Sequence, residues 1–482
     1  MSLPRHALPE PEILAHIPPA RAVAPSEVAA RLSTAPRLAV LDDDPTGTQT
    51  VKDIPVLTTW AVDDLRWALR QNSPAFFVLT NTRSLSPQDA AARNREIARA
   101  LHEASQAESI PYVIASRGDS TLRGHFPLET DVLAEELTAT GAAPDGVVLV
   151  PAYIEAGRLT VDSVHWMRTP EGLLPVGESE FARDATFGYT SSALPDWVEE
   201  KTKGRVPADK VLRITLTDLR TGGPAHVAGL LRGLRDGATA VVDAVRDDDL
   251  RVLALALAEA EETGTRLLHR VGPSFVRARA GQPAHPPLTV SELAPLRAPA
   301  PHGLIVVGSH VGLTTRQLNR LRATTTDIAE HELDVSLLLD PARRDAHIRE
   351  IADAAATTMA TADTVVRTTR TVVTAADPDE SLAISRSVSA ALVETVRLIT
   401  AARRPAFVIA KGGITSSDTA THGLEIRRAW ARGTLLPGIV SLWQPADGPA
   451  AGIPYIVFAG NVGGDDALAD ALTLLRSAAR CC

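Results

Sequence analysis

The stretch RLAVLDDDPTGT, residues 37–48, joins a short apolar run to a polar turn. Its first five residues are typical of a buried β-strand, and the aspartates, proline, threonines and glycine that follow favour a turn. The same succession of apolar run, polar turn and helix-like segment recurs along most of the chain. Such alternation predicts βα units with mainly parallel sheets, and therefore the α/β fold class.

The alternation falls into two blocks, separated by a proline-rich segment. In the first block the predicted strands are Arg37–Leu41, Ala75–Thr80, Tyr112–Ala115, Gly146–Val150, Arg213–Leu216, Ala238–Val242 and Arg266–Leu268. In the second block they are Gly303–Val307, Thr364–Arg367, Ala406–Ala410 and Pro454–Phe458. Six prolines between Gly281 and Pro301 predict a linker. We therefore expect two α/β domains, residues 1–280 and 302–482, joined by the linker 281–301, with a ligand cleft between the domains.

Composition and charge exclude several classes of protein. The 482 residues are 45% hydrophobic and 22% charged, which is ordinary for a globular protein and excludes disordered, collagen-like and disulfide-scaffold chains. A net charge of −9 argues against nucleic acid and anionic membranes as partners, and more weakly against an anionic substrate. The only cysteines, Cys481 and Cys482, are adjacent at the end of the chain and cannot cross-link the fold. The sequence shows neither a secretory signal nor an apolar run of membrane-spanning length, so we expect a cytoplasmic protein.

In open α/β sheets, ligands bind beyond the carboxyl ends of the strands, so the residues that follow each strand are the candidate site. Asp42, Asp43 and Asp44 follow the first strand. One of these carboxylates could accept a proton from a hydroxyl or hold a cation, whereas the alternative is a turn with an Asp or Thr helix cap. Arg83 follows the second strand and either points into the same crevice or is a solvated loop arginine.

Two further strand ends carry polar clusters. The loop SRGDSTLRG, residues 116–124, follows the third strand and combines two arginines, three hydroxyls, a carboxylate and two glycines. Arginine binds carboxylates and phosphates in a bidentate manner, so we predict ligand binding here, although Asp119 or Ser120 could instead cap the next helix. The fourth strand leads into PAYIEAGR, residues 151–158, where the spacing of Glu155 and Arg158 favours a mutual ion pair.

The second domain has glycine-rich turns after three of its strands. They read GSHVGLTT (308–315), KGGITSSD (411–418) and AGNVGGDD (459–466). Glycine loops can present backbone N–H groups to phosphates, although neither GxxxxGK[ST] nor a strand-linked GxGxxG is present. Asp465 and Asp466 are typical of acids in the first turn of a helix. The sequence also lacks HExxH, paired CxxC and GxSxG motifs, which argues against a structural zinc site and a serine hydrolase.

Taken together, these motifs resemble the four-carbon acid sugar kinases, ATP-dependent enzymes that act on threonate, erythronate or 3-oxo-tetronates. The resemblance runs in order from about Leu38 to Leu468, and DSTLRG at 119–124 is its most specific part. The matching motifs are residues 41–47, 117–124, 151–158, 308–309, 412–416 and 460–463. The sequence departs from the family pattern at Asp44-Pro45, where one acid fewer and no proline are more common, and at Phe458, where a lysine is common.

The resemblance implies that the first domain binds the acid sugar and the second binds ATP. The implied sugar-binding residues are Asp43, Arg83, Arg117, Gly118, Asp119 and Ser120. The implied ATP-binding residues are Ser309, Gly412, Gly413, Thr415, Gly460, Asn461, Val462 and Gly463. For the reaction, we expect Arg117 or Arg123 to bind the sugar carboxylate, and Asp43 to accept the proton of the terminal hydroxyl that is phosphorylated. Mg²⁺ and the glycine-loop amides would offset phosphoryl charge.

Other functions remain open at this point. The substrate could be a related branched or five-carbon oxo-acid sugar. The chain could also be a non-catalytic sensor of an acid sugar, although the three glycine turns would then have no role. A dehydrogenase is disfavoured by the missing dinucleotide fingerprint. The sequence assigns no metal ligands and leaves the oligomeric state open, with a homodimer as one option.

Overall fold

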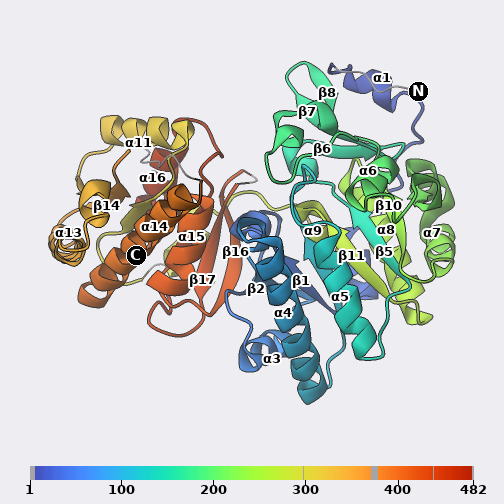
Figure 1. Ribbon diagram of the computed structural model, residues 1–482, viewed down its shortest axis with the longest axis horizontal. Helices are drawn as coiled ribbons and strands as arrows, with labels where there is room; N and C mark the ends of the chain where they lie inside the picture. The colour runs from blue at the N-terminus through green and yellow to red at the C-terminus, as the bar shows by residue number, and fades with distance from the viewer. Residues whose placement is uncertain (1–5, 297, 371–377, 438, 480–482) are drawn as a thin grey trace. The chain divides into compact units, whose positions relative to one another are not determined.

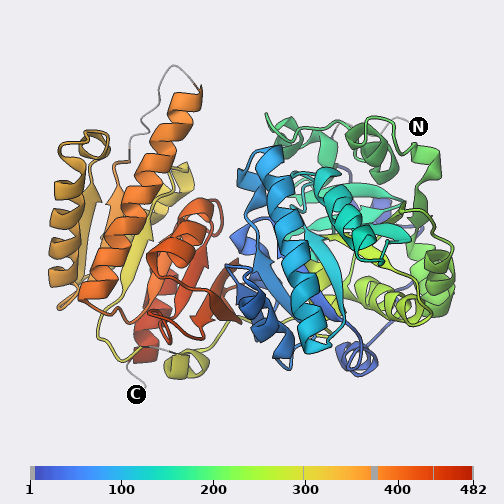
Figure 2. The ribbon, with the colours of Figure 1, turned by 60° about the horizontal axis from the view of Figure 1, so that its bottom comes forward.

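The computed structural model describes residues 6–296, 298–370, 378–437 and 439–479, and its contacts divide the chain into two compact units (Figures 1 and 2). Unit 1 consists of Met1–Val51 and Trp60–Ala284, and unit 2 of Lys52–Thr59 and His285–Cys482. Each unit has a sheet with helices packed on it, so the predicted α/β fold class is confirmed.

The large sheet of unit 1 is entirely parallel and has the strand order β3-β1-β4-β11-β5-β10-β9. Its strands are β1 (Arg37–Asp42), β3 (Ala75–Leu79), β4 (Tyr112–Arg117), β5 (Gly146–Val150), β9 (Leu212–Ile214), β10 (Ala238–Val242) and β11 (Leu267–Val271). They are nearly continuous apolar runs because both faces of a parallel sheet are covered by helices. The register pairs Asp42 with Arg117, which places the ends of β1 and β4 side by side.

Helices alternate with these strands along most of the unit, as the sequence predicts, and others precede β1 or follow β11. They are α1 (Glu10–Leu14), α2 (Pro25–Arg31), α3 (Val62–Arg70), α4 (Pro87–Glu108), α5 (Leu128–Ala139), α6 (Leu194–Lys201), α7 (Gly223–Arg232), α8 (Asp247–Glu262) and α9 (Pro273–Arg279). α3, α4 and α5 pack in succession, and Figure 1 shows α4 and α5 side by side. The start of α4 follows from its sequence, because the Ser86 side chain accepts a hydrogen bond from the Asp89 amide and Pro87 occupies the first turn.

Unit 1 also contains a small antiparallel sheet that the sequence did not predict. Its strands are β6 (Arg158–Val161), β7 (Val164–Thr169) and β8 (Gly172–Pro175), in the order β6-β7-β8. This sheet follows β5 directly along the chain, so its first residues lie just beyond a strand end of the large sheet. The backbone of Leu8, near the N-terminus, bonds to Leu173 of β8.

The sheet of unit 2 is mixed, with the strand order β13-β14-β12-β15-β18-β17-β16-β2. The first five strands in this order, β13, β14, β12, β15 and β18, are parallel to one another. β17, β16 and β2 continue the sheet in antiparallel fashion. The strands are β2 (Ile54–Leu57), β12 (Leu304–Val307), β13 (Ile328–Leu333), β14 (Asp363–Thr368), β15 (Val408–Lys411), β16 (Arg428–Leu436), β17 (Ile439–Pro445) and β18 (Tyr455–Phe458).

The helices of unit 2 are α10 (Val290–Leu293), α11 (Gly312–Thr324), α12 (Val335–Leu338), α13 (Arg344–Thr358), α14 (Pro378–Ala402), α15 (Gly413–Asp418) and α16 (Ala467–Ala479). α13 packs against α14, and α11 packs against α16. In Figure 2, α14 is the long orange helix. Among the described residues, no helix combines the length and apolar character that a membrane span requires.

The segment 281–301, predicted to be a linker, has a defined structure where it is described. Thr289 and Glu292 form a capping box at the start of α10, and α10 packs against α16. Leu288 and Leu293 are buried in the core of unit 2. The structure therefore differs from the predicted linker, because these apolar side chains cover part of the core in spite of the prolines around them.

Unit 2 also includes a strand from the N-terminal part of the chain. β2 pairs in antiparallel fashion with β16, from Leu57 beside Arg428 to Ile54 beside Ala431. The chain thus enters unit 2 at Lys52, returns to unit 1 at Trp60 and enters unit 2 again at His285. This differs from the predicted division at residues 280 and 302.

The large sheet of each unit has a point, among its parallel strands, at which the direction of the connections reverses. In unit 1, β1 and β4 are neighbours, and the chain leads from β1 to β3 on one side and from β4 to β5 on the other. In unit 2, β12 and β15 are neighbours in the same way, with β14 and β13 on one side and β18 on the other. Ligands of open α/β sheets bind at such switch points. Four of the motifs singled out in the sequence follow these strands.

Candidate functional site

The three aspartates after β1 have different environments. Asp42 and Asp43 are buried, whereas Asp44 is partly exposed. The Asp44 carboxylate accepts a hydrogen bond of 2.9 Å from the Thr46 amide and caps the short helix Pro45–Thr50. The turn interpretation therefore applies to Asp44, and Asp42 and Asp43 are left as the carboxylates of the candidate site.

Arg83 binds Asp43 in a bidentate manner. Its Nε lies 3.1 Å from Asp43 Oδ2, and its Nη2 lies 2.5 Å from Asp43 Oδ1. Nη1 of Arg83 is 3.5 Å from Asp44 Oδ2. Arg83 is therefore not a solvated loop arginine, and its contact with Asp43 brings the ends of β3 and β1 together.

Arg117, the last residue of β4, is buried against the same acidic run. Its guanidinium contacts the Asp42 carboxylate, and Nη2 donates a 2.7 Å hydrogen bond to the Asp44 carbonyl. Gly47 lies directly over this pair, since a Cβ atom at Gly47 would be only 2.0 Å from Asp42 Oδ2 and 2.3 Å from Arg117 Nη2. The glycine thus allows the loop to close over Asp42.

Burial and the neighbouring charges shift the pKa values of Asp42 and Asp44 in opposite directions. Burial raises the pKa of Asp42 to about 7, and Asp43 and Asp44 add to this rise while Arg117 opposes it. Burial also disfavours the charged form of Asp44, but Arg83, Arg117 and the hydrogen bonds from Thr46 outweigh it and lower its pKa. A carboxyl that titrates near neutral pH is thus placed next to Asp43.

The loop after β4 forms a second ion-pair cluster. Asp119 accepts a 2.7 Å hydrogen bond from Arg123 Nε, and a hydrogen bond from the Thr121 hydroxyl. Burial disfavours a charge on Asp119, but Arg83, Arg123 and these hydrogen bonds dominate and lower its pKa to about 2. Arg123 also lies over the ring of Phe181 at 4.8 Å. Neither Asp119 nor Ser120 accepts a helix N-cap hydrogen bond, because α5 begins later, after Pro127.

Side chains from the region after β5 form hydrogen bonds to backbone carbonyls of this loop. Nε2 of the buried His165 lies 2.7 Å from the Ser120 carbonyl, and its Nδ1 lies 2.9 Å from the Thr160 hydroxyl. The Tyr189 hydroxyl donates a 2.6 Å hydrogen bond to the Thr121 carbonyl. Burial lowers the pKa of His165 to about 4, so the ring is neutral at physiological pH and can donate to Ser120.

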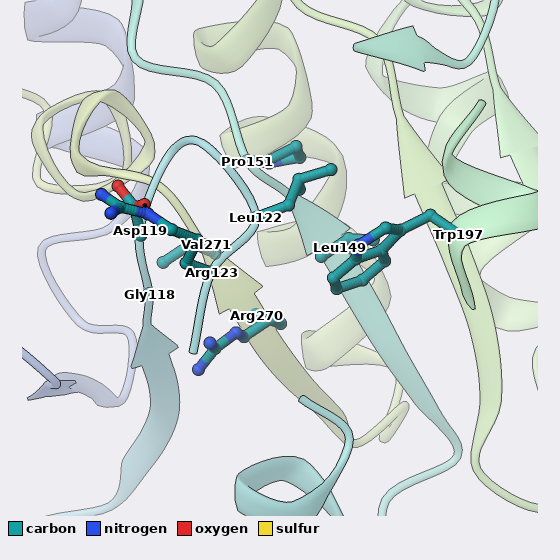
Figure 3. A pocket seen from close by; sticks show the side chains of 9 residues that line it. All are labelled: Gly118, Asp119, Leu122, Arg123, Leu149, Pro151, Trp197, Arg270 and Val271. Carbon is teal, nitrogen blue, oxygen red and sulfur yellow. Dashed lines mark hydrogen bonds and ion pairs between the residues drawn. The ribbon is translucent and has the colours of Figure 1, made fainter. Parts of the chain in front are cut away.

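A small pocket opens beside the same loop (Figure 3). Figure 3 shows Asp119 and Arg123 on the loop, Arg270 below them, and the apolar Leu149 and Trp197 on the other side. The complete lining is Gly118, Asp119, Leu122, Arg123, Leu149, Pro151, Trp197, Arg270 and Val271. Three of the predicted sugar-binding residues, Gly118, Asp119 and Arg123, therefore line one pocket, and Arg117 and Ser120 are adjacent to them along the loop.

Arg270 was missed by the sequence analysis. It lies in β11 and donates hydrogen bonds of 2.7 Å to the Ser116 hydroxyl and 2.6 Å to the Glu129 carboxylate. A Cβ atom at Gly118 would lie 2.4 Å from Arg270 Nη2, so this glycine is needed for the close approach. The available signal was a charged residue next to the predicted apolar strand Arg266–Leu268, which in fact continues to Val271.

The predicted ion pair between Glu155 and Arg158 is wrong. Glu155 instead contacts Arg277 of α9 and accepts a hydrogen bond from the Ser274 hydroxyl. Spacing along the chain favoured Arg158, but residues 154–156 form a short 3₁₀ helix and Arg158 begins β6, so the two side chains do not share a helical face.

In unit 2 the predicted glycine turns lie together at the ends of β12, β15 and β18. The Thr314 hydroxyl donates a hydrogen bond to the Gly460 carbonyl at 3.0 Å, and its oxygen lies 3.2 Å from Ser309 Oγ. A Cβ atom at Gly460 would be 2.5 Å from Ser309 Oγ, and one at Gly412 would be 3.0 Å from Thr415 Oγ1. Ser309, Gly412, Thr415 and Gly460 are thus brought into one cluster.

The rest of the third turn is fixed by a helix. Gln317 of α11 donates hydrogen bonds to the carbonyls of Val462 at 3.0 Å and Gly464 at 2.8 Å. Asn461 and Gly463 are exposed on this turn, and Gly463 has a φ of +81° that favours glycine. Gly413, the remaining predicted residue, is the first residue of α15.

The acids at the end of this turn have structural partners. Arg316 contacts Asp465 at 2.9 Å, and Arg320 contacts Asp466. Both acids are therefore accounted for by ion pairs with arginines on the surface of α11. Within the described ranges, no group of three or more His, Cys, Asp or Glu side chains is arranged to hold a metal ion.

Lys411 is the residue of unit 2 that the sequence analysis left without a role. It ends β15, is fully buried, and its Nζ donates a 2.6 Å hydrogen bond to the Ala459 carbonyl. The ammonium group also lies 3.8 Å from the ring centre of Phe458, the position at which the family pattern often has a lysine. Burial lowers the pKa of Lys411 to about 7. Its signal in the sequence was a cation at the end of an apolar strand, directly before two glycines.

Two family models match this chain. Residues 38–279 match a sugar-binding N-terminal domain, and residues 304–468 match a nucleotide-binding C-terminal domain. A comparison with curated proteins finds no match.

Several solved structures resemble the chain over almost its whole length. A Salmonella typhimurium LT2 protein provisionally named a tRNA synthase is 18% identical, with 90% of this chain and 98% of that chain covered and a TM-score of 0.66. Haemophilus influenzae protein HI1011, of the DUF1537 family, is 19% identical, with 91% and 100% covered and a TM-score of 0.61. At these identities the likeness shows the shared fold. The two domain matches show more, namely that the chain belongs to the four-carbon acid sugar kinase family, with a sugar-binding N-terminal and a nucleotide-binding C-terminal domain.

Proposed function

We propose that the protein is an ATP-dependent kinase that phosphorylates the terminal hydroxyl of a four-carbon acid sugar of the threonate, erythronate or 3-oxo-tetronate type. The observation that carries the proposal is that a sugar-binding and a nucleotide-binding domain occur in one chain. In each unit, many of the residues that we propose to bind ligands follow the two neighbouring strands at which the connections of the sheet reverse, which supports the proposal. As an ATP-dependent enzyme of sugar metabolism, it would act in the cytoplasm.

In the proposed reaction, the hydroxyl oxygen of the sugar forms a bond to the γ-phosphorus of ATP while the bond to the bridging oxygen of ADP breaks. Asp43 accepts the hydroxyl proton. Arg83 supports this role by fixing both carboxylate oxygens of Asp43. Such transfers depend on positioning and charge stabilisation more than on covalent chemistry. Asp42 is the second carboxyl at this strand end, but Arg117 and Gly47 enclose it.

For the nucleotide, we propose that the turns carrying Ser309, Gly412, Gly413, Thr415 and Gly460–Gly463 contact ATP. Glycines let the backbone approach a phosphate closely and present its N–H groups. The described carboxylates of unit 2 include no cluster suited to a metal. We therefore assign no protein ligand to Mg²⁺, which would arrive bound to ATP.

The test is a coupled ADP-release assay of the full chain with threonate, erythronate, their 3-oxo forms and the five-carbon aldonates. We expect ADP release that depends on one of the four-carbon acids. Release with a five-carbon acid alone would identify the alternative substrate class. Binding of an acid sugar without binding of ATP-Mg²⁺ in calorimetry would instead favour a non-catalytic sensor.

A further inference from the structure

Most arginines around the strand ends of unit 1 already have acidic partners. The pairs are Arg83 with Asp43, Arg117 with Asp42, Arg123 with Asp119, Arg270 with Glu129, and Arg277 with Glu155. A cation that is held by a buried carboxylate has less charge left to attract an incoming anion, and removing it from that partner is costly. The expectation that Arg117 or Arg123 binds the sugar carboxylate therefore has a competitor inside the protein.

Arg158 differs from these arginines because it forms no ion pair with an acidic side chain of the described residues. It is the first residue of β6, and its backbone exchanges hydrogen bonds of 2.9 and 3.0 Å with Tyr153. Its Nη1 donates to the Ala156 carbonyl, and its Nε is buried without a hydrogen-bond partner. Among the described residues, no Asp or Glu carboxylate lies within ion-pair distance of its guanidinium. Within the described part of the chain, Arg158 thus forms no ion pair within contact distance, and its Nε donor is unused.

Arg158 also lies within electrostatic reach of the pocket loop. Burial lowers the pKa of Arg158, and Asp119 and Tyr153 oppose this while Arg123 adds to it. Asp119 and Arg123 are both lining residues of the pocket in Figure 3. His165, whose ring contacts the Ser120 carbonyl, also senses the charge of Arg158. The Tyr153 hydroxyl donates a 3.0 Å hydrogen bond to the Gln49 side chain. This bond links the backbone partner of Arg158 to the turn that follows the three aspartates.

We propose that Arg158 binds the carboxylate of the acid sugar and thereby selects acids over neutral polyols. The inference rests on the proposed function, and it names a specificity residue of the same site. The planar guanidinium fork matches a carboxylate, and Arg158 is half-buried with no acidic side chain of the described ranges in an ion pair that would compete with the ligand. A neutral tetritol has the same chain of hydroxyls but offers Arg158 no charge.

The experiment measures binding rather than turnover. Isothermal titration of the full-chain protein compares D-erythronate and L-threonate with erythritol and threitol, for the wild type and for Arg158→Gln and Arg158→Lys. Arg168→Gln is the matched control, because Arg168 lies in the same small sheet but is ion-paired with Glu10 on the surface. ADP binding by each variant reports whether the remainder of the chain is intact.

We expect Arg158→Gln to weaken binding of the acid roughly 10- to 100-fold, the usual value of a charged hydrogen-bond pair, while tetritol and ADP binding stay unchanged. The acid affinity of Arg158→Lys should lie between that of the wild type and that of Arg158→Gln. The acid affinity of Arg168→Gln should match that of the wild type. Unchanged acid binding in Arg158→Gln, or an equal loss for acids and tetritols, would overturn the assignment. Acid binding that depends on Arg158 without any ADP release would support the assignment and overturn the kinase. A wild type that binds no acid would overturn both.

Discussion

At the scale of residues, Asp42 and Asp43 are neighbours with different surroundings. Asp43 is fixed by two hydrogen bonds from Arg83, and a Cβ atom at Gly124 would lie 3.2 Å from its Oδ2, so a glycine borders this oxygen. Asp42 is enclosed by Arg117 and Gly47. Both carboxylates are buried and each is bordered by a glycine. Gly47 approaches Asp42 more closely than Gly124 approaches Asp43, so more room is left beside Asp43, the residue that the family resemblance favours as the base.

Replacement of Asp43 by Asn should abolish most turnover. The amide keeps the size of the side chain but cannot accept the hydroxyl proton, and general bases contribute roughly 10²- to 10⁴-fold to such rates. ADP release at saturating substrates should fall by about this factor, while ADP affinity measured by calorimetry stays close to that of the wild type. Near-wild-type turnover of D43N would contradict the assignment of Asp43 as the base.

Lys411 should influence both nucleotide binding and the pH dependence of stability. Its folded pKa of about 7 lies below the value near 10.4 of an unfolded lysine. Between these values the unfolded chain binds one proton more than the folded chain, so the contribution of Lys411 to stability rises with pH and is lost as pH falls towards 7.

Replacement by Met removes this group but keeps the length of the side chain. From pH 7 to pH 9.5, the free energy of unfolding of the wild type should therefore rise relative to that of K411M, by at most about 3 kcal/mol. K411M should also bind ADP more weakly, because it loses the hydrogen bond that holds the Ala459 carbonyl. Denaturant titrations at the two pH values check the first effect and calorimetry the second, with the exposed Lys210→Met as the control. A constant difference in stability between K411M and the wild type would contradict the shifted pKa.

At the scale of elements, the parallel strands were the predictable part of the fold. Ala238–Val242 and Gly146–Val150 were predicted with their observed bounds, because strands buried on both faces are continuous apolar runs. β16 was missed because it lacks the continuous apolar run of the predicted strands, although its alternation of polar and apolar residues is itself typical of a half-buried strand; Gly433 lies at a bulge. β2 was missed because it is only four residues long, contains Pro55 and pairs with residues far away in the sequence. Local periodicity carries no information about such a partner.

The candidate site was predictable to a similar extent. Loops at the ends of parallel strands meet at one edge of a sheet, so Asp43, Arg83 and Arg117 could be placed together from the sequence. The ion-pair partner of each charged residue could not be predicted from the sequence, because the partners lie far apart along the chain. Arg270 pairs with Glu129, and Arg277 pairs with Glu155. Only the folded structure identifies the arginine that forms no ion pair with an acidic side chain among the residues described.

The placement of β2 makes a substitution in the N-terminal region act on unit 2. Val56 is buried and lies beside Ala429 of β16, so Val56→Asp would bury a charge at this strand pair and destabilise it by several kcal/mol. Amide hydrogen exchange should accelerate in β16, and ADP binding should weaken. Ala61→Asp is the control, because Ala61 is exposed at the start of α3. Unchanged exchange in β16 of V56D would contradict the pairing.

At the scale of the whole molecule, a net charge of −9 is compatible with two anionic ligands. Net charge governs broad, nonspecific association, whereas a small ligand responds to the groups within a few ångströms. In unit 1 those groups are mostly matched pairs, so the local field depends on the few charges that lack a partner. The net charge therefore does not disfavour an anionic substrate, but it still disfavours nucleic acid as a partner.

The repeated passage of the chain between the units gives the last prediction. ADP at 100 times its dissociation constant should stabilise the folded state that binds it by about 2.7 kcal/mol. If β2 is an integral strand of unit 2, the amides of Ile54–Leu57 that exchange through opening of this sheet should slow together with those of β16, although β2 precedes most of the sugar-binding domain in sequence. Hydrogen exchange with and without ADP measures this, with β10 of unit 1 as the internal reference. Exchange in β2 that follows β10 instead of β16 would mean that the strand does not share the stability of the nucleotide-binding unit.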